Sequence, residues 1–445
     1  MTMSMDLDME WEQPPSMLSK LCSRVVNYVE ELTKAPKERT LGPNHQLAGT
    51  FSVVAPELIE QVAFFLNTTD NNSFRLTCKY IEHSTFSHWE RTCLASIQTD
   101  LSHRSFMRLS DLIMQEPLAA RVRKIVVTER NFGGLGKGFK WERVLGELYL
   151  NTDQVSIRMW TALFSQFDYL RCLKVQRGFT AWDRDERTLL SASDAFTVVM
   201  HIITHAQLPV TSFELDFELQ NWNSIDLGRI RRTQLVGSPF TDSWAKLQSL
   251  SLRLKLTEEA VAGVPYLLMH SCPNVKSLSL DCDGGAYAGR LLHVMAQNRM
   301  NAKWKLEELS LRKITVNDVE DLGFFLQHHS RTLRKLKLAS ITLNEPLIWP
   351  KVFALLRDCF LQLESIEVGD LRDFGDARHL VHWPNVSTTS TRDTDGVRFV
   401  YHQRRWPPMN PRAPKKNFYI AYQGKQMQTA LTLIEEWAVY MPLGP

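Results

Sequence analysis

The sequence predicts an α/β protein in which a small helical block is followed by an array of alternating strands and helices. Two observations support this prediction. Eight copies of a short pattern, apolar-x-x-apolar-x-apolar, follow one another between residues 122 and 368, with helical periodicity between several of them. Ahead of the array, residues 51 to 100 carry helical patterns separated by polar turn residues. We expect the helical block at residues 49–100 and the array at residues 101–385.

The composition is that of an ordinary globular protein and narrows the classes of function. Of the 445 residues, 44% are apolar and 23% are charged, which is enough apolar material for a sizeable core. The net charge of +3 gives no argument for nucleic acid or an acidic membrane as the main partner. The seven cysteines are scattered without a CxxC pair, which is typical of reduced thiols in the cytosol or nucleus.

Residues 1–48 are expected to form a tail, one helix and a linker. The stretch MTMSMDLDMEWEQPP is acidic and lacks the apolar segment of a signal peptide. From Ser16 to about Thr33, apolar residues recur every 3 or 4 positions, which predicts one amphipathic helix. No apolar run approaches the ~18 residues of a membrane span. We therefore expect a cytoplasmic or nuclear protein with no membrane partner.

The helical block opens with VAPELIEQVAFFL, residues 54 to 66. Pro56 suits the first turn of a helix, where its missing N–H costs nothing, and Glu57 favours the positive end of the helix dipole. One stripe within about 120° of the helical wheel holds five apolar residues, which we expect the block's own core to cover: Leu58, Ile59, Val62, Phe65 and Leu66. Phe64 projects from the opposite side. It is expected either beneath a neighbouring loop or as an anchor in a partner's groove.

The array continues almost to the end of the chain. Its copies begin at Val122, Leu170, Val210, Leu247, Val275, Leu306, Leu333 and Leu363. The last five are spaced by 27 to 31 residues, and the earlier ones carry insertions. A strand plus a helix at this period is typical of a leucine-rich-repeat solenoid, whose units bury their apolar faces against one another.

Residues 386–445 are expected to cap the exposed end of the array. The segment VRFVYH predicts a strand, and Gln403 to Lys416 a basic, proline-rich loop. A final helix is expected from Tyr422 to Met441.

Side chains alternate along a strand, so the residues between the apolar positions of each copy share the opposite face of the sheet. This face is the candidate substrate-binding surface, with the candidate residues Ser249, Ser251, Arg253, Ser279, Asp281, Ser310, Arg312, Lys335 and Lys337. Its three cations Arg312, Lys335 and Lys337 are expected to form a positive patch beside the acidic residues Glu214, Asp216 and Asp281. The alternative is a solvated strand face without a partner.

The helical block resembles the F-box, in the form common in fungal F-box proteins. Pro56-Glu57-Leu58-Ile59 matches the start of the motif, Arg75-Leu76-Thr77-Cys78-Lys79 matches a later helix closely, and Trp89 sits near the terminal tryptophan. The family's leading Leu-Pro pair falls here on Val54-Ala55, two positions that normally lie against the partner. The resemblance covers about 50 of the 445 residues, and leucine-rich repeats behind an F-box are a common arrangement in the family.

The resemblance implies a substrate receptor of an SCF-type cullin–RING ubiquitin ligase. The F-box would dock on the Skp-type adaptor, the repeats would hold a protein substrate, and the chain would perform no chemistry and need no cofactor. The match and the helical wheel together assign to the adaptor the residues Val54, Ala55, Pro56, Glu57, Leu58, Ile59, Phe64, Leu76 and Trp89. The alternative is a leucine-rich-repeat interaction scaffold that acts outside a ligase.

Four further features bear a likeness to chemical sites, and we interpret none of them as one. NFGGLGKGFK, residues 131–140, lacks the spacer and the hydroxyl after its lysine that a phosphate-binding P-loop needs. His201 and His205 have metal-helix spacing but lack the adjacent glutamate and a third ligand. Cys272 and Cys282 have no matching cysteine pair for zinc. The basic loop around Trp406 is expected to be cap surface instead of a nucleic-acid site or an import signal.

Overall fold

The protein, described by a computed structural model, falls into two compact units, Met1–Ala95 and Ser96–Pro445. The structure describes residues 54–128, 139–144, 147–151, 153–176, 192–216, 238–253, 256, 268–282, 286–297, 304–374, 378–386, 397–405, 412 and 415–442. The tail, helix and linker predicted for residues 1–48 lie outside these ranges.

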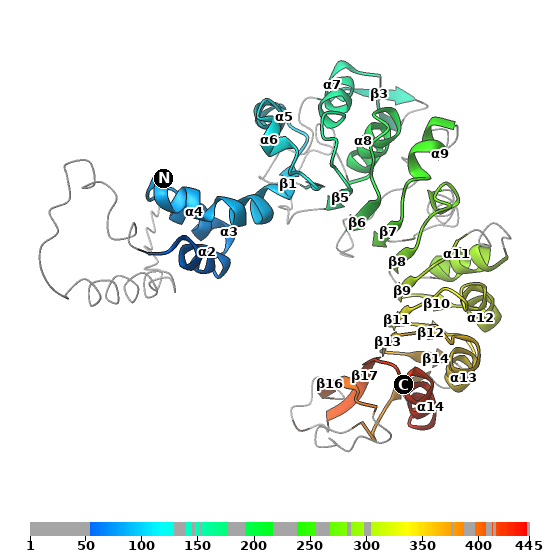
Figure 1. Cartoon of the computed structure of the whole chain (residues 1–445). Helices are drawn as coiled ribbons and strands as arrows, with labels where there is room; N and C mark the ends of the chain where they lie inside the picture. Colours follow the sequence, from blue (N-terminus) through cyan, green and yellow to red (C-terminus); the bar gives the residue numbers. More distant parts are fainter. Residues whose placement is uncertain are drawn as a thin grey trace, which may run out of the picture. The chain divides into compact units, whose positions relative to one another are not determined.

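The described part of the first unit, residues 54–95, contains three short helices and a turn of π-helix (Figure 1). They are α2 (Pro56–Phe64), α3 (Thr68–Arg75), α4 (Lys79–Trp89) and η2 (Glu90–Leu94). Pro56 lies in the first turn of α2, which confirms the predicted helix start. Asn67 caps α3, because its side-chain oxygen accepts the backbone N–H of Asp70 at 2.9 Å. The buried apolar residues of α2 and α4 are few: Ile59, Ala63 and Ile81.

Only part of the apolar stripe of α2 is buried in this core. Ile59 and Ala63 are buried, whereas Leu58 and Phe65 are 53% and 80% exposed. The buried direction therefore lies roughly 100–140° around the helix from Leu58, at one edge of the stripe. The expectation that the block's own core covers all five stripe residues is wrong. Ile59 and Ala63 are the residues of α2 that are buried instead.

The second unit is organised by an 11-stranded sheet. Nine parallel strands come first, in the order β1 (Ser96–Thr99), β2 (Lys124–Val127), β5 (Cys172–Gln176), β6 (Ser212–Asp216), β7 (Ser249–Arg253), β8 (Ser277–Asp281), β9 (Glu308–Arg312), β11 (Lys335–Ala339) and β13 (Ser365–Gly369). The antiparallel strands β17 (Lys415–Gln423) and β16 (Val400–Arg405) complete it. Each of the eight copies of the pattern forms one strand, from β2 to β13, so the fold is α/β as predicted.

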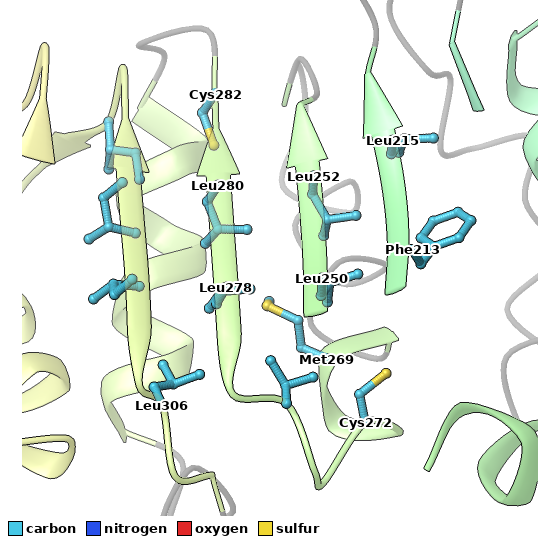
Figure 2. Packing of buried hydrophobic residues seen from close by; sticks show 14 of the residues in the cluster. Phe213, Leu215, Leu250, Leu252, Met269, Cys272, Leu278, Leu280, Cys282 and Leu306 are labelled. Carbon is cyan, nitrogen blue, oxygen red and sulfur yellow. The ribbon is translucent and has the colours of Figure 1, made fainter. Parts of the chain in front are cut away.

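Alternate residues of these strands are buried, as the pattern predicts. In β5, β6, β7 and β8 the second and fourth residues are buried and the others are partly exposed. Figure 2 shows Leu250 and Leu252 of β7 beside Leu278 and Leu280 of β8 in one packed layer. The register explains this layer, because Leu250 pairs with Leu278 and Leu252 with Leu280.

Helices cover the apolar face of the sheet (Figure 1). The chain forms α7 (Val155–Phe164), α8 (Ala192–His205), α9 (Ser238–Trp244), α11 (Ala286–Gln297), α12 (Val319–His328) and α13 (Trp349–Cys359) between the strands. Their buried side chains join those of the strands in one core. Two short helices, α5 (His103–Ile113) and α6 (Glu116–Ala119), lie between β1 and β2, and a hairpin of β3 (Trp141–Val144) and β4 (Glu147–Leu150) precedes α7.

A second sheet, which the sequence pattern does not predict, follows the last strands of the array. Its order is β10 (Thr315–Val316), β12 (Thr342–Leu343), β14 (Arg372–Phe374), β15 (Arg378–His382) and β18 (Val439–Pro442). The residue directly after β9, β11 and β13 has a left-handed backbone, with φ of 53° at Lys313, 55° at Ser340 and 52° at Asp370. This recurring turn leads the chain into the short strands of the second sheet.

Two predicted elements need correction. Ser96–Thr99, expected within the helical block, is a strand that pairs with β2. In the C-terminal region, Gln403 to Arg405 and Lys415 to Lys416 pair as strands instead of forming a loop, and the expected final helix is only α14 (Met427–Glu436). The reason is the edge of β13, which β17 covers by pairing with it from Ser365 to Gly369.

A helical glycine fixes the distance between α11 and the second sheet. A Cβ on Gly289 would collide with the carbonyl oxygen of Thr315 in β10. Gly289→Ala should therefore lower the free energy of unfolding by about 1–3 kcal/mol, as overpacking does. Gly323→Ala in α12 is the matched control, because its Cβ would meet only a side-chain atom of Leu355 at 3.9 Å. That variant should be neutral or gain up to about 1 kcal/mol from helix propensity, and equal urea midpoints for the two variants would contradict the packing argument.

A buried histidine makes stability depend on pH. Burial, with a smaller contribution from the charge of His328, lowers the pKa of His329 to about 4 from its ordinary 6.5. The unfolded chain binds this proton more readily, so stability falls as the pH drops from 6.5 to 4, by up to about 1.4 kcal/mol per pH unit. His329→Leu should flatten the plot of unfolding free energy against pH in this window. His103→Leu, an exposed control, should leave the slope unchanged; equal slopes for wild type and His329→Leu would refute the assignment.

Candidate protein-binding surfaces

The first unit exposes apolar side chains on one arc of α2. Leu58, Phe64 and Phe65 are 53%, 69% and 80% exposed. At about 100° per residue, all three fall within about 120° on the side away from Ile59 and Ala63. The rings of Phe64 and Phe65 meet edge to face, with centroids 5.5 Å apart. We call Leu58, Phe64 and Phe65 the apolar arc.

A cation–π contact holds α3 against α4. The Arg75 guanidinium lies 4.0 Å from the Trp89 ring centroid and 5.6 Å from that of Phe86. The Trp89 indole N–H donates to the Asn72 side-chain oxygen at 2.8 Å. Burial lowers the pKa of Arg75, against the opposing charge of Glu82. These contacts give a structural role to Arg75 and Trp89.

Beside this contact lies a hollow of about 600 Å³. It is lined by Asn72, Arg75, Leu76, Cys78, Lys79, Glu82 and Trp89. Leu76 at its margin is 87% exposed, the largest exposure among the large apolar side chains that the structure describes. Four of the five residues of the Arg-Leu-x-Cys-Lys motif thus line one depression.

The residues assigned to the adaptor divide into exposed and buried ones. Ala55, Pro56 and Glu57 are exposed, as are Leu58, Phe64 and Leu76. Val54 is partly buried, and its carbonyl oxygen accepts the Tyr80 hydroxyl at 2.9 Å. Ile59 is 2% exposed and belongs to the core, so its assignment as a contact residue is wrong. Phe65, which the wheel placed with the core, is exposed beside Phe64, because the buried side of α2 is the one that carries Ile59 and Ala63.

The polar face of the main sheet carries a ladder of alternating charges. Lys174 Nζ lies 2.7 Å from Asp216 Oδ2, and Arg253 Nη1 lies 3.2 Å from Asp216 Oδ1. Arg253 Nε and Arg312 Nη1 lie 3.5 Å and 3.6 Å from the same oxygen of Asp281. The ladder therefore crosses from β5 to β9, with each charge beside an opposite one on the next strand. Figure 1 shows these strands side by side.

Burial changes the titration of the ladder's carboxylates. Burial alone would raise the pKa of Asp216, but the hydrogen bonds and charges of Lys174 and Arg253 outweigh it, so the pKa lies below its usual 3.8. At Asp281 burial prevails over Arg312, Lys313 and Arg253, and the pKa lies above the usual value. Asp281 is thus the carboxylate of the ladder that is most easily neutralised.

The three cations Arg312, Lys335 and Lys337 do not form the predicted positive patch, because each one is paired with a carboxylate. Lys335 Nζ lies 2.6 Å from Glu308 Oε1, Lys337 forms an ion pair with Glu367, and Arg312 contacts Asp281. The in-register strands place cations opposite anions and prevent segregation of charge. The candidate serines, Ser249, Ser251, Ser279 and Ser310, are all partly exposed on the same face. Sequence reasoning missed Lys124, which forms an ion pair with Glu214, with Lys124 Nζ 2.7 Å from Glu214 Oε1.

The motifs that resemble chemical sites have ordinary surroundings where they are described. NFGGLGKGFK lies almost wholly outside the described residues. The rings of His201 and His205 stack 3.8 Å apart on α8, and burial, helped by the charge of His205, lowers the pKa of His201 to about 4. Cys272 and Cys282 are buried in the core, and burial raises the pKa of Cys272. Among the described residues, no three His, Cys, Asp or Glu side chains are grouped to hold a metal.

Comparison with known proteins does not assign the chain to a family. No protein-family model matches it, and a search of curated proteins finds no match. Within the described part of the chain, every helix is too short or too polar to cross a membrane.

Removal of one carboxylate should break the charge ladder at its centre. Asp216→Asn weakens the pairs with Lys174 and Arg253 and should lower the free energy of unfolding by about 1 kcal/mol, because the pairs are partly exposed and screened. The deficit should disappear below the folded-state pKa of Asp216, which lies under 3.8, since the wild-type carboxylate is then also neutral. Urea unfolding measures both. Asp242→Asn, on the exposed side of α9, is the control, and an equal effect there would argue against the ladder.

Proposed function

We propose that this protein is a substrate-recognition subunit of an SCF-type cullin–RING ubiquitin ligase. In this proposal residues 54–95 act as an F-box that docks on the Skp-type adaptor. The second unit acts as a leucine-rich-repeat solenoid that holds a protein substrate, closed at its end by β17 and α14. The chain contributes recognition only, and transfer of ubiquitin takes place on other subunits.

The apolar arc of α2 is the observation that carries the proposal. Leu58, Phe64 and Phe65 remain exposed on a helix whose start matches the F-box motif. Burial of each side chain against a partner is worth roughly 1.5–3 kcal/mol before the costs of association. Three such residues on one side of a short helix are therefore enough to anchor a stable contact.

The strand array supports the proposed role of the second unit in holding a substrate. Eight copies of one pattern align position by position, with helices on the opposite side of the sheet from the polar face. Strong, isolated charges are scarce on that face, because the ladder pairs them. A substrate would have to present its own alternating charges and exchange ion pairs strand by strand, which favours a folded protein surface over a uniformly charged ligand.

Truncation of the apolar arc should weaken adaptor binding. In titration calorimetry of the full chain with a Skp-type adaptor, Phe64→Ala should cost roughly 1–3 kcal/mol, about 5- to 150-fold in affinity. The triple variant L58A/F64A/F65A should abolish measurable binding. Phe324→Ala, a partly exposed phenylalanine of α12, is the control and should leave the affinity unchanged.

Two results would contradict this proposal in different ways. Full affinity of a folded triple variant would exclude the arc from the interface. Absence of adaptor binding by the wild-type chain would exclude the ligase role and favour a leucine-rich-repeat scaffold that acts outside a ligase. The variants leave the buried core residues Ile59 and Ala63 unchanged and should therefore fold. Melting curves check that each variant is folded.

A further inference from the structure

A groove of about 740 Å³ lies at the edge of the main sheet where the chain enters the strands. Apart from the residue before β5 and one before β9, its walls come from the turns that lead into β6, β7 and β8. None of its lining residues belongs to a strand, so the groove is separate from the polar face. We call it the entry groove.

The entry groove is basic. Arg171, Lys246, Lys276 and Lys305 line it from four different turns, and no acidic residue is among its lining residues. Lys276 has a carboxylate partner in Glu307, at 3.1 Å. Arg171 and Lys246 instead donate long hydrogen bonds of 3.4 Å to the backbone carbonyls of Pro209 and Gln207. The groove therefore concentrates positive charge, whereas the ladder on the polar face pairs each positive charge with a negative one.

Side chains, not backbone groups, are available for recognition in this groove. The amide of each turn already donates to the turn before it: Thr211 to Arg171 at 2.9 Å, Gln248 to Thr211 at 2.8 Å and Lys276 to Gln248 at 2.7 Å. A cradle of free amides for a phosphate, or pairing with an added strand, is therefore excluded at these positions.

The apolar part of the lining indicates which class of partner the entry groove can bind. Pro209, Ala245 and Pro273 contribute hydrocarbon between the cations, and no aromatic ring lines the groove. A single-stranded nucleic acid gains much of its affinity by stacking on aromatic rings, which this lining lacks. Carboxylates flanking apolar side chains match both parts of the lining.

We propose that the entry groove binds an extended, acidic peptide segment of a partner protein, in which glutamate or aspartate residues flank apolar ones. The four strand spacings from β5 to β9, at about 4.8 Å each, correspond to about six extended residues. The cations hold the carboxylates, and the prolines and Ala245 contact the apolar side chains. The proposal is independent of the ligase role, because it uses neither α2 nor the polar face.

Fluorescence anisotropy of the full chain tests this proposal. The probe is a labelled peptide of about twelve residues with four glutamates between valines and leucines, compared with the same peptide carrying glutamines. Wild type should bind the glutamate peptide at least tenfold more tightly, with an affinity that falls as salt rises. K246E/K305E should lose at least tenfold in affinity and K246A/K305A somewhat less. R158E/K351E, with the same change of net charge on exposed positions of α7 and α13, should stay within about twofold.

Other outcomes overturn the proposal. An equal loss in both charge-reversal variants would reveal a general charge effect. Equal affinity for the glutamate and glutamine peptides would exclude recognition of carboxylates. Tighter binding of oligothymidylate, or of phosphatidylcholine vesicles containing phosphatidylserine, would assign the cations to nucleic acid or lipid instead.

Discussion

The in-register pairing of parallel strands is the constraint on which the second unit depends. From β5 to β13, the first residue of each strand pairs with the first residue of the next. Because side chains alternate with a period of two, this register fixes which residues reach the helices and which remain on the polar face. A slip of one residue in any strand would exchange its leucines for serines and charges in the core.

The same constraint explains why the two charged regions of this unit differ. On the polar face, register sets Arg253 opposite both Asp216 and Asp281, so that opposite charges neutralise each other across strands. In the entry groove, Lys276 pairs with Glu307, whereas Arg171 and Lys246 donate to backbone carbonyls instead of carboxylates. Charge is therefore balanced along the ladder, whereas the entry groove is lined by four cations and no acidic residue. A mixed-charge protein surface suits the first region, and an acidic segment suits the second.

The sequence predicts those parts of the fold that depend on local periodicity. All eight strands of the array were placed correctly, since alternation of apolar residues is a property of a few neighbouring positions. The left-handed turns were not foreseen, because Lys313, Ser340 and Asp370 stand where glycine or asparagine is the usual signal. Pairing of β17 with β13 was missed for another reason, namely that it joins segments about fifty residues apart and leaves no local mark.

The sequence predicted the apolar residues of α2 but not which of them are buried. The buried side of the helix carries Ile59 and Ala63, and hydrophobicity alone does not distinguish this side from the exposed one. Sequence reasoning therefore predicted the exposure of Phe64 but not that of Phe65, and it assigned the buried Ile59 to a partner. The ion pairs on the polar face were also not predicted, because each ion pair depends on two strands and on the register between them.

The departure from the F-box motif at Val54 has a limited physical consequence for the proposed docking. The path of the chain into α2 is held by the backbone, since the Val54 carbonyl accepts the Tyr80 hydroxyl at 2.9 Å, whichever side chain stands at that position. Replacement of leucine by valine removes one methylene, worth about 0.8 kcal/mol of burial. The apolar arc offers three large side chains against this loss. In the proposed docking, adaptor affinity should therefore depend on Leu58, Phe64 and Phe65 more than on the replacement of leucine by Val54.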